Sequence, residues 1–302
     1  MIPTFPNFKN IEWKDRTEVE QFTKDFPPYS DFNFVSMWSW NTREKMRLSQ
    51  LNGNLVLLFY DYITETPFLS FIGTHSIADT AQRLIDYSLQ KFQVPYLKLI
   101  PEFVAVNLPK ETFCCRADED AHDYILSVEY LSSFDTLPNS HHAARMYKKY
   151  SRQFPNCTVK KCSVSEAKKE DYIQLFKDWA KLKCLNHLEL NEYSAFERYI
   201  QIKDCVNTLV SLYDGDTMTG FAAYEIISSS QALGHFIKAN NSYKGVYDAL
   251  NFTVSKLLKE QNIDYWNFEQ DLGVPALRES KRKLNPAYYL KKFIVESKTN
   301  SL

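Results

Sequence analysis

The sequence predicts an α+β protein made of two similar units. Short apolar runs typical of strands alternate with amphipathic helix patterns along the 302 residues. The order hairpin, helix, strand occurs twice, over residues 52–100 and 207–268. This is a repeat of element order without residue identity. A chain of this length also fits two domains of ordinary size, so mixed sheets backed by helices are expected in both halves.

The first half contains the first of these repeats. Asn52-Gly53 is a hairpin turn signal. Apolar spacing predicts a helix over 79–92, with Ala81, Leu84 and Ile85 on its inner side. The remaining expected elements are a helix over 12–26, an aromatic core-filling stretch over 32–40, and strands at 55–60, 67–72, 96–100 and 124–130.

The second half repeats that order. Helices are expected over 171–185 and 246–261, because apolar residues recur there at helical spacing. Strands are expected at 208–213, 218–227, 231–238 and 264–269, and Asp214-Gly215-Asp216 forms the hairpin turn between the first two. We therefore place an N-terminal domain at 1–135 and a C-terminal domain at 136–302.

The composition limits the classes of function. Hydrophobic residues make up 44% of the chain and charged residues 24%, which is typical of a globular protein. Only seven glycines argue against several glycine-rich phosphate loops. The net charge of −1 means that contact with nucleic acid or a membrane requires a local patch. The six cysteines do not form a disulfide-framework pattern, and the N-terminus lacks signal-peptide features.

No stretch of the sequence reads as a membrane span. The longest apolar run, 55–60, is far shorter than the roughly 20 residues of a transmembrane helix. With the absence of a signal peptide, this predicts a cytoplasmic protein, with peripheral contact to a membrane as a further expectation. The sequence does not indicate an oligomeric state.

A basic helix is expected at the start of the C-terminal domain. Residues 143–154 form a helix pattern with a stripe of four cations, Arg145, Lys148, Lys149 and Arg152, and with aromatic residues on the opposite side. We interpret it as a linker helix. Such a stripe suits phosphates or RNA, and a solvated helix face is the equal alternative.

The segment 264–286 is the candidate site. Glu269 and Asp271 are expected at the end of a strand, and Pro275 is suited to begin the next helix. That helix carries Arg278, Lys281 and Arg282 at i, i+3 and i+4, and Asn285-Pro286 ends it. If the two carboxylates share a face as alternate strand residues, their repulsion raises one pKa. The arrangement fits a substrate site and equally an ion-pair network with a helix cap.

A metal site is not expected from the sequence. His141, His142, Cys157 and Cys162 have no spacing typical of zinc ligands. We therefore assign no metal and no bound cofactor to this chain.

Three segments resemble the phosphatidylglycerol lysyltransferase C-terminal family. Glu269-Gln270-Asp271-Leu272-Gly273, followed by Leu277-Arg278, Lys281 and Asn285-Pro286, is similar to its signature. Residues 147–154, Tyr-Lys-Lys-Tyr-Ser-Arg-Gln-Phe, resemble its basic segment. Pro28-Tyr29-Ser30-Asp31-Phe32 with Trp38-Ser39-Trp40 resembles its N-terminal pattern. The similarity spans nearly the whole chain.

The resemblance implies two tandem acyltransferase-like (GNAT-like) domains and aminoacyl transfer from aminoacyl-tRNA to a lipid headgroup or another small acceptor. The lipid-modifying relatives carry a multi-helix membrane domain ahead of this region, and no such domain is expected in this sequence. The resemblance therefore supports the fold more strongly than it supports an anionic phospholipid as the acceptor. On this basis Glu269 and Asp271 are the catalytic candidates, and they would bind the donor's ammonium or accept a proton. The substrate-binding candidates are Arg278, Lys281, Arg282, Arg145, Lys148, Lys149 and Arg152.

Two other functions stay open at this point. The first is an acyl-CoA N-acyltransferase, with its pyrophosphate between the strand ending at Lys238 and the helix beginning near Val246. Only one glycine, Gly245, lies in that connection, so the signal is weak. The second is a binder of RNA or anionic ligands without catalysis, acting through the basic stripe.

Overall fold

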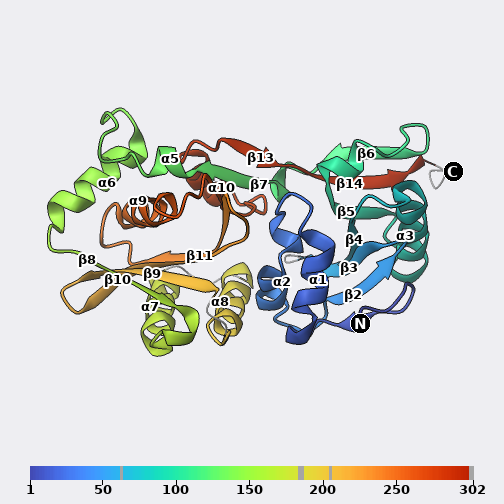
Figure 1. The fold of residues 1–302 in the computed structure, drawn as a ribbon, viewed down its shortest axis with the longest axis horizontal. Coiled ribbons are helices and arrows are strands. Elements are labelled where there is room, and N and C mark those ends of the chain that lie inside the picture. Colours follow the sequence, from blue (N-terminus) through green and yellow to red (C-terminus); the bar gives the residue numbers. More distant parts are fainter. Residues whose placement is uncertain (62–63, 183–186, 204–205, 299–302) are drawn as a thin grey trace. The chain divides into compact units, whose positions relative to one another are not determined.

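The protein forms two compact units, each with one mixed sheet covered by helices (Figure 1). The computed structural model describes residues 1–61, 64–182, 187–203 and 206–298. The first unit comprises Met1–Asp123 and Leu290–Leu302, and the second comprises Tyr124–Tyr289. The predicted α+β class with two mixed sheets flanked by helices is confirmed.

Within the described residues, the sheet of the first unit has seven strands in the order β1-β2-β3-β4-β5-β14-β6. Neighbours are antiparallel except β4 and β5, which are parallel. The Asn52-Gly53 turn joins β2 to β3, and both of its residues have positive φ, as such a hairpin requires. The strands are β1 (Lys9–Asn10), β2 (Arg47–Leu51), β3 (Asn54–Tyr60), β4 (Pro67–Ile72), β5 (Tyr96–Pro101), β6 (Phe113–Ala117) and β14 (Lys292–Ser297).

The helices of the first unit enclose an apolar core. The predicted inner residues of α3 (Ile77–Phe92), Ala81, Leu84 and Ile85, are fully buried against this sheet. The helix expected over 12–26 is shorter, with η1 (Trp13–Asp15) leading into α1 (Arg16–Thr23). The aromatic stretch 32–40 contains a helix of its own. The other helices are η2 (Ser30–Phe32), α2 (Phe34–Trp40), α4 (Glu102–Ala105) and η3 (Glu119–Ala121).

The described sheet of the second unit also has seven strands, in the order β13-β7-β12-β11-β10-β9-β8. Here β11 and β12 are parallel, and they pair only from Gln231↔Tyr265 to Leu233↔Asn267. Beyond Leu233 strand β11 continues, whereas β12 ends. The strands are β7 (Asp123–Ser127), β8 (Thr158–Ser163), β9 (Asn207–Asp214), β10 (Thr217–Ile226), β11 (Gln231–Ala239), β12 (Tyr265–Asn267) and β13 (Tyr288–Leu290).

Helices cover both faces of this second sheet (Figure 1). Helix α9 packs on one face together with α5 and α6, while α7 packs on the other face and contacts α8. The last three residues of the helix expected over 171–185 lie outside the described residues. The helices are α5 (Val128–Leu131), α6 (His142–Gln153), η4 (Val164–Glu166), α7 (Lys169–Leu182), α8 (His187–Tyr199), α9 (Val246–Lys259) and α10 (Pro275–Arg282).

The two sheets exchange strands. The boundaries of the two units therefore differ from the predicted domain boundary between residues 135 and 136. Strand β7 follows β6 of the first sheet in sequence but pairs with β12 in the second. Strand β14 follows β13 of the second sheet but pairs with β5 and β6 in the first. The strand expected over 124–130 ends at Ser127 and continues as α5. Helix α6, expected as a linker, lies within the second unit and packs on α9.

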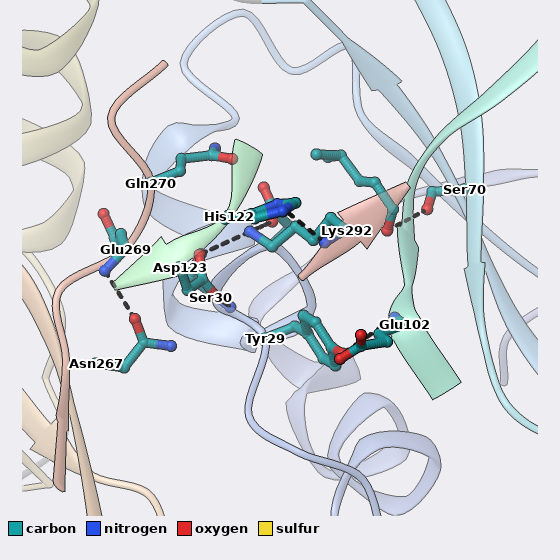
Figure 2. Close-up of polar contacts among 12 residues, drawn as sticks. Tyr29, Ser30, Ser70, Glu102, His122, Asp123, Asn267, Glu269, Gln270 and Lys292 are labelled. Atoms are coloured by element: carbon teal, nitrogen blue, oxygen red, sulfur yellow. Dashed lines mark hydrogen bonds and ion pairs between the residues drawn. The ribbon is translucent and has the colours of Figure 1, made fainter. Parts of the chain in front are cut away.

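A buried ion cluster in the first unit surrounds Lys292, the first residue of β14 (Figure 2). Its fully buried ammonium donates to Asp31 and, at 2.7 Å, to Asp123 Oδ1. The backbone amide and hydroxyl of Ser30 donate to Asp123 at 2.8 and 2.7 Å. Burial lowers the pKa of Lys292, but the two carboxylates outweigh it and raise that pKa above its ordinary value. Lys292 is therefore charged and compensated.

Candidate functional site

The segment after β12 is a tight loop rather than a continued strand. Strand β12 ends at Asn267, and Glu269, Leu272 and Gly273 have φ values of 55°, 56° and 71°. A left-handed conformation is unfavourable for a residue other than glycine, so local contacts must hold it. The buried Asn267 Oδ1 accepts the Glu269 amide at 2.7 Å (Figure 2).

The expected strand over 264–269 is therefore wrong at its end. Glu269 and Asp271 are not alternate residues of one strand, because the chain turns at Glu269. Backbone hydrogen bonds from the Phe268 amide to Tyr124 O and from the Tyr124 amide to Glu269 O fix this turn against β7.

Asp271 is fully buried, and both of its carboxylate oxygens accept hydrogen bonds. Arg278 donates from Nε to Oδ2 at 2.8 Å and from Nη2 to Oδ1 at 2.9 Å, a bidentate pair. Tyr124 Oη donates at 2.6 Å and the Gly273 amide at 2.9 Å. Burial raises the pKa of Asp271, but the hydrogen bonds from Arg278, Tyr124 and Gly273 together lower it below its ordinary value.

This geometry favours the ion-pair interpretation for Asp271. The pKa falls, whereas repulsion between paired carboxylates would have raised one. The predicted helix cap is absent, since Val274 is the N-cap residue of α10. Asp271 instead fixes the Arg278 guanidinium seven residues further along the chain.

Lys281, a residue of α10, stabilises the same loop. Its ammonium is largely buried and donates to the Phe268 carbonyl and, at 2.7 Å, to the Gln270 carbonyl. It also lies 5.7 Å from the centre of the Tyr124 ring. The charge predicted to bind substrate phosphate is thus directed at the backbone on either side of Glu269.

An open hollow of about 470 Å³ lies beside α10, within the second unit. Arg282 is exposed, and Lys283 forms an ion pair with Glu279 at 2.6 Å. The helical spacing i, i+3 and i+4 from Arg278 predicts Lys281 as a site residue, but Lys281 does not line the hollow. Lys283, which this spacing omits, does line it. The lining residues are Gly273, Pro275, Arg278, Glu279, Arg282 and Lys283.

The predicted basic stripe on α6 divides into two kinds of residue. Lys148 donates to the Leu137 carbonyl, and Arg145 donates to the Asn139 carbonyl at 3.5 Å, so both attach the preceding loop to the helix. Lys149 and Arg152 are exposed. Residues 136–165 contain no Asp or Glu, and this segment adds two exposed lysines on the edge strand β8, Lys160 and Lys161.

Helix α6 is held against the turn between β11 and α9. Gly245 has a φ of 90°, and a Cβ there would lie 2.3 Å from Met146 O. The ring of Tyr147 stacks on Phe252 with centroids 4.0 Å apart. These contacts fix the basic face of α6 to the body of the second unit.

The same turn is where the alternative acyl-CoA function would place the pyrophosphate. Its amides are largely used within the protein: Asn240 donates to Thr219 O, Tyr243 to Asn240 O, and Val246 to Tyr243 O. The Ser242 amide donates to Asn240 Oδ1 at 2.9 Å. A phosphate cradle needs free amides, so this turn is a poor match to one.

The residues considered as metal ligands have other contacts. Cys157 Sγ lies 3.0 Å from Tyr150 Oη, and Cys162 Sγ lies 3.6 Å from Tyr172 Oη. In the part of the chain that the structure describes, His, Cys, Asp and Glu form no group of three or more suited to a metal ion. None of the described helices is long and apolar enough to cross a membrane.

Comparison with known proteins gives a family and three close folds. Residues 23–296 match the family described as phosphatidylglycerol lysyltransferase, C-terminal. No curated protein matches the chain significantly. A conserved protein of unknown function from Bacteroides thetaiotaomicron superposes with a TM-score of 0.82 at 20% identity, covering 99% of this chain and 100% of that one.

Two further solved structures share this fold. One is the C-terminal domain of a putative lysylphosphatidylglycerol synthetase from Agrobacterium fabrum, with a TM-score of 0.60, 10% identity, and 94% and 91% coverage. The other is L-PGS from Bacillus licheniformis, with a TM-score of 0.59, 13% identity, and 100% and 95% coverage. The chain therefore belongs to the phosphatidylglycerol lysyltransferase C-terminal family and shares the fold of these solved structures.

Proposed function

We propose that this protein transfers an amino acid from an aminoacyl-tRNA to a small acceptor, with an anionic phospholipid headgroup as the first candidate. The observation that carries the proposal is the pairing of a constrained carboxylate loop with a cationic hollow in one unit. Glu269 lies on the loop that Asn267 and Lys281 hold, and Arg278, Arg282 and Lys283 line the hollow at its end.

Aminoacyl transfer from an ester needs orientation and charge stabilisation more than a covalent enzyme intermediate. In our proposal Glu269 binds the ammonium of the donor amino acid. Arg282 and Lys283 bind a phosphate of the acceptor or of the tRNA end. Asp271 is a positioning residue, because it holds the Arg278 guanidinium beside the hollow.

The basic surface is proposed as the contact for the tRNA backbone. We define it as Lys149 and Arg152 of α6 with Lys160 and Lys161 of β8. These cations are exposed, and they belong to a 30-residue segment without a carboxylate, so a polyanion meets no repulsion from that segment. Lys148 and Arg145 contribute by shaping the helix and its preceding loop.

The test is a donor-consumption assay with the purified full chain. Radiolabelled aminoacyl-tRNAs and acyl-CoAs are offered separately, each with phosphatidylglycerol vesicles and with a cell-extract acceptor pool. The proposal predicts loss of label from at least one aminoacyl-tRNA and its appearance in an acceptor. Consumption of acyl-CoA alone would establish the acyl-CoA reaction instead. RNA binding with no consumption of any donor would indicate a non-catalytic binder.

A further inference from the structure

Tyr124, the first residue of the second unit, contacts the Glu269 loop through its main chain. Its amide donates to the Glu269 carbonyl at 3.1 Å, and its carbonyl accepts from the Phe268 amide at 2.8 Å. Both bonds are made by the backbone of β7, so they do not depend on the side chain at position 124. The turn that carries Glu269 is therefore held in place even when the Tyr124 side chain is changed.

The hydroxyl of Tyr124 contacts a different part of the site. Within a side chain that is 2% exposed, Oη donates to Asp271 Oδ2 at 2.6 Å. The same carboxylate oxygen accepts from Arg278 Nε at 2.8 Å. Arg278 in turn lines the hollow. A single oxygen atom, Asp271 Oδ2, thus joins the Tyr124 hydroxyl to a guanidinium of the hollow.

The ring of Tyr124 is held by two neighbours. The Tyr289 ring packs edge-on against it, with centroids 5.0 Å apart and an angle of 68° between the ring planes. The Lys281 ammonium lies 5.7 Å from the centre of the Tyr124 ring. Because these contacts restrict the ring, the hydroxyl keeps its direction toward Asp271. A side chain locked in this way is suited to hold a neighbouring group at a fixed position.

The Tyr124 hydroxyl remains protonated at neutral pH. Burial and the hydrogen bond to Asp271 raise the pKa of this hydroxyl to about 12, although the Arg282 guanidinium acts to lower it. A group with so high a pKa is a poor proton acceptor at neutral pH. The hydroxyl is therefore suited to orient the Asp271 carboxylate and not to exchange a proton with a substrate.

We propose that Tyr124 is a positioning residue whose hydroxyl orients Asp271 and thereby sets the Arg278 guanidinium for a phosphate in the hollow. The inference rests on the proposed function for the source of that phosphate, which is the acceptor or the tRNA end. The hydroxyl serves only the phosphate part of the site, because the Glu269 turn is held by the backbone of residue 124. Tyr124→Phe removes the hydroxyl and keeps the ring, so it separates these two parts.

A purely structural role for Tyr124 has different consequences. Under it, Tyr124→Phe lowers the stability, but the folded protein binds phosphate as the wild type does. Tyr172→Phe is the matched control, because Tyr172 is also a buried tyrosine of the second unit and its Oη accepts from Ser211 Oγ at 2.8 Å. Tyr172 does not line the hollow. Both variants lose a buried hydroxyl, and only one of the two hydroxyls contacts the site.

The first measurement is a titration of the full chain with inorganic phosphate, followed by the ¹⁵N-resolved Nε–H signal of Arg278. Arg278→Lys assigns that signal. We expect Tyr124→Phe to shift it and to bind phosphate roughly 10-fold more weakly, the lower end of what losing an outer-shell partner costs at metal sites. Tyr172→Phe should match the wild type in both. An unmoved signal with wild-type affinity in Tyr124→Phe would overturn the inference, as would a wild-type protein that binds no phosphate.

The second measurement is steady-state transfer from aminoacyl-tRNA to phosphatidylglycerol vesicles. Tyr124→Phe should raise one KM roughly 10-fold and leave kcat within about twofold, because a lost binding contact acts on KM alone. The KM that rises, for aminoacyl-tRNA or for phosphatidylglycerol, identifies the source of the phosphate. A lower kcat with both KM values unchanged would refute the role of Tyr124. If the wild type uses no aminoacyl-tRNA but Tyr124→Phe still weakens phosphate binding, the proposed function fails and the positioning role stands.

Discussion

Lys292 and Asp123, the first residues of the two exchanged strands, form an ion pair that is fully buried in the first unit, with 2.7 Å between Nζ and Oδ1. They are 169 positions apart in the sequence. The chain leaves the first unit immediately after Asp123 and returns at Leu290, two residues before Lys292. The pair therefore holds together the two places where the chain passes between the units. Asp31 and Ser30 complete the cluster.

Replacing Lys292 by Met should destabilise the protein strongly. It leaves Asp31 and Asp123 buried without their cation, which costs about 3–5 kcal/mol for a buried pair broken on one side. Urea unfolding measures this change. Lys291→Met is the matched control, because Lys291 is half exposed and its pair with Glu102 is worth about 1 kcal/mol or less. Equal losses for the two variants would contradict the assigned role of Lys292.

The Asp271–Arg278 pair makes stability depend on acid pH. The pKa of Asp271 in the folded protein lies below the ordinary 3.8, so its ionised form stabilises the fold above pH 3.8. That contribution is lost as pH falls through the lower, folded-state pKa. Asp271→Asn should cost about 3 kcal/mol near neutral pH, and its deficit against wild type should shrink below pH 3.8. Asp264→Asn, at an exposed aspartate before β12, should change stability at neutral pH by only about 0.5 kcal/mol or less.

Gly245 should tolerate alanine much less than Gly215 does. Both have positive φ, 90° and 58°, so each substitution incurs roughly 1–2 kcal/mol of backbone strain. At Gly245 the new Cβ would also collide with Met146 O, whereas at Gly215 no described heavy atom lies within 4 Å. We expect Gly245→Ala to cost at least about 1 kcal/mol more than Gly215→Ala in thermal unfolding. Similar losses would mean that α6 is not tightly held at this turn.

Neutralising the basic surface should weaken RNA binding in a salt-dependent way. Changing Lys149 and Arg152 to Gln should reduce the slope of log affinity against log salt by about 0.7–0.9 per residue. Filter binding of uncharged tRNA at several salt concentrations measures that slope. Lys24→Gln with Lys91→Gln removes two exposed lysines of the first unit and should leave it unchanged. Identical slopes for all three proteins would exclude this surface as the RNA contact.

Much of the fold follows from local sequence. The predicted strands 55–60, 67–72 and 231–238 match β3, β4 and β11 within a residue at each end. Leu250 and Val254, two of the apolar residues that recur at helical spacing in the helix expected over 246–261, are buried in α9. Apolar periodicity decides these elements, because each packs on a face that its own residues define.

The strand exchange could not be predicted in the same way. Pairing of β14 with β5 joins Lys292 to Pro101, residues almost 200 positions apart, and no local pattern specifies such a partner. The site was only partly predictable for a related reason. The sequence shows that Lys281 is a cation. It does not show that Lys281 donates to the carbonyls of Phe268 and Gln270, because these carbonyls face Lys281 only as a result of the turn at Glu269.

In our proposal, the loop at Glu269 serves aminoacyl transfer and the basic surface binds the RNA. The most direct measurement compares wild type with Glu269→Ala in two assays on the same preparations, tRNA binding and transfer from aminoacyl-tRNA. We expect unchanged tRNA affinity and a rate at least about 10²-fold lower for Glu269→Ala, a loss of the size that one charged contact at a reacting centre contributes. A Glu269→Ala protein that transfers at the wild-type rate would refute the proposed role of Glu269.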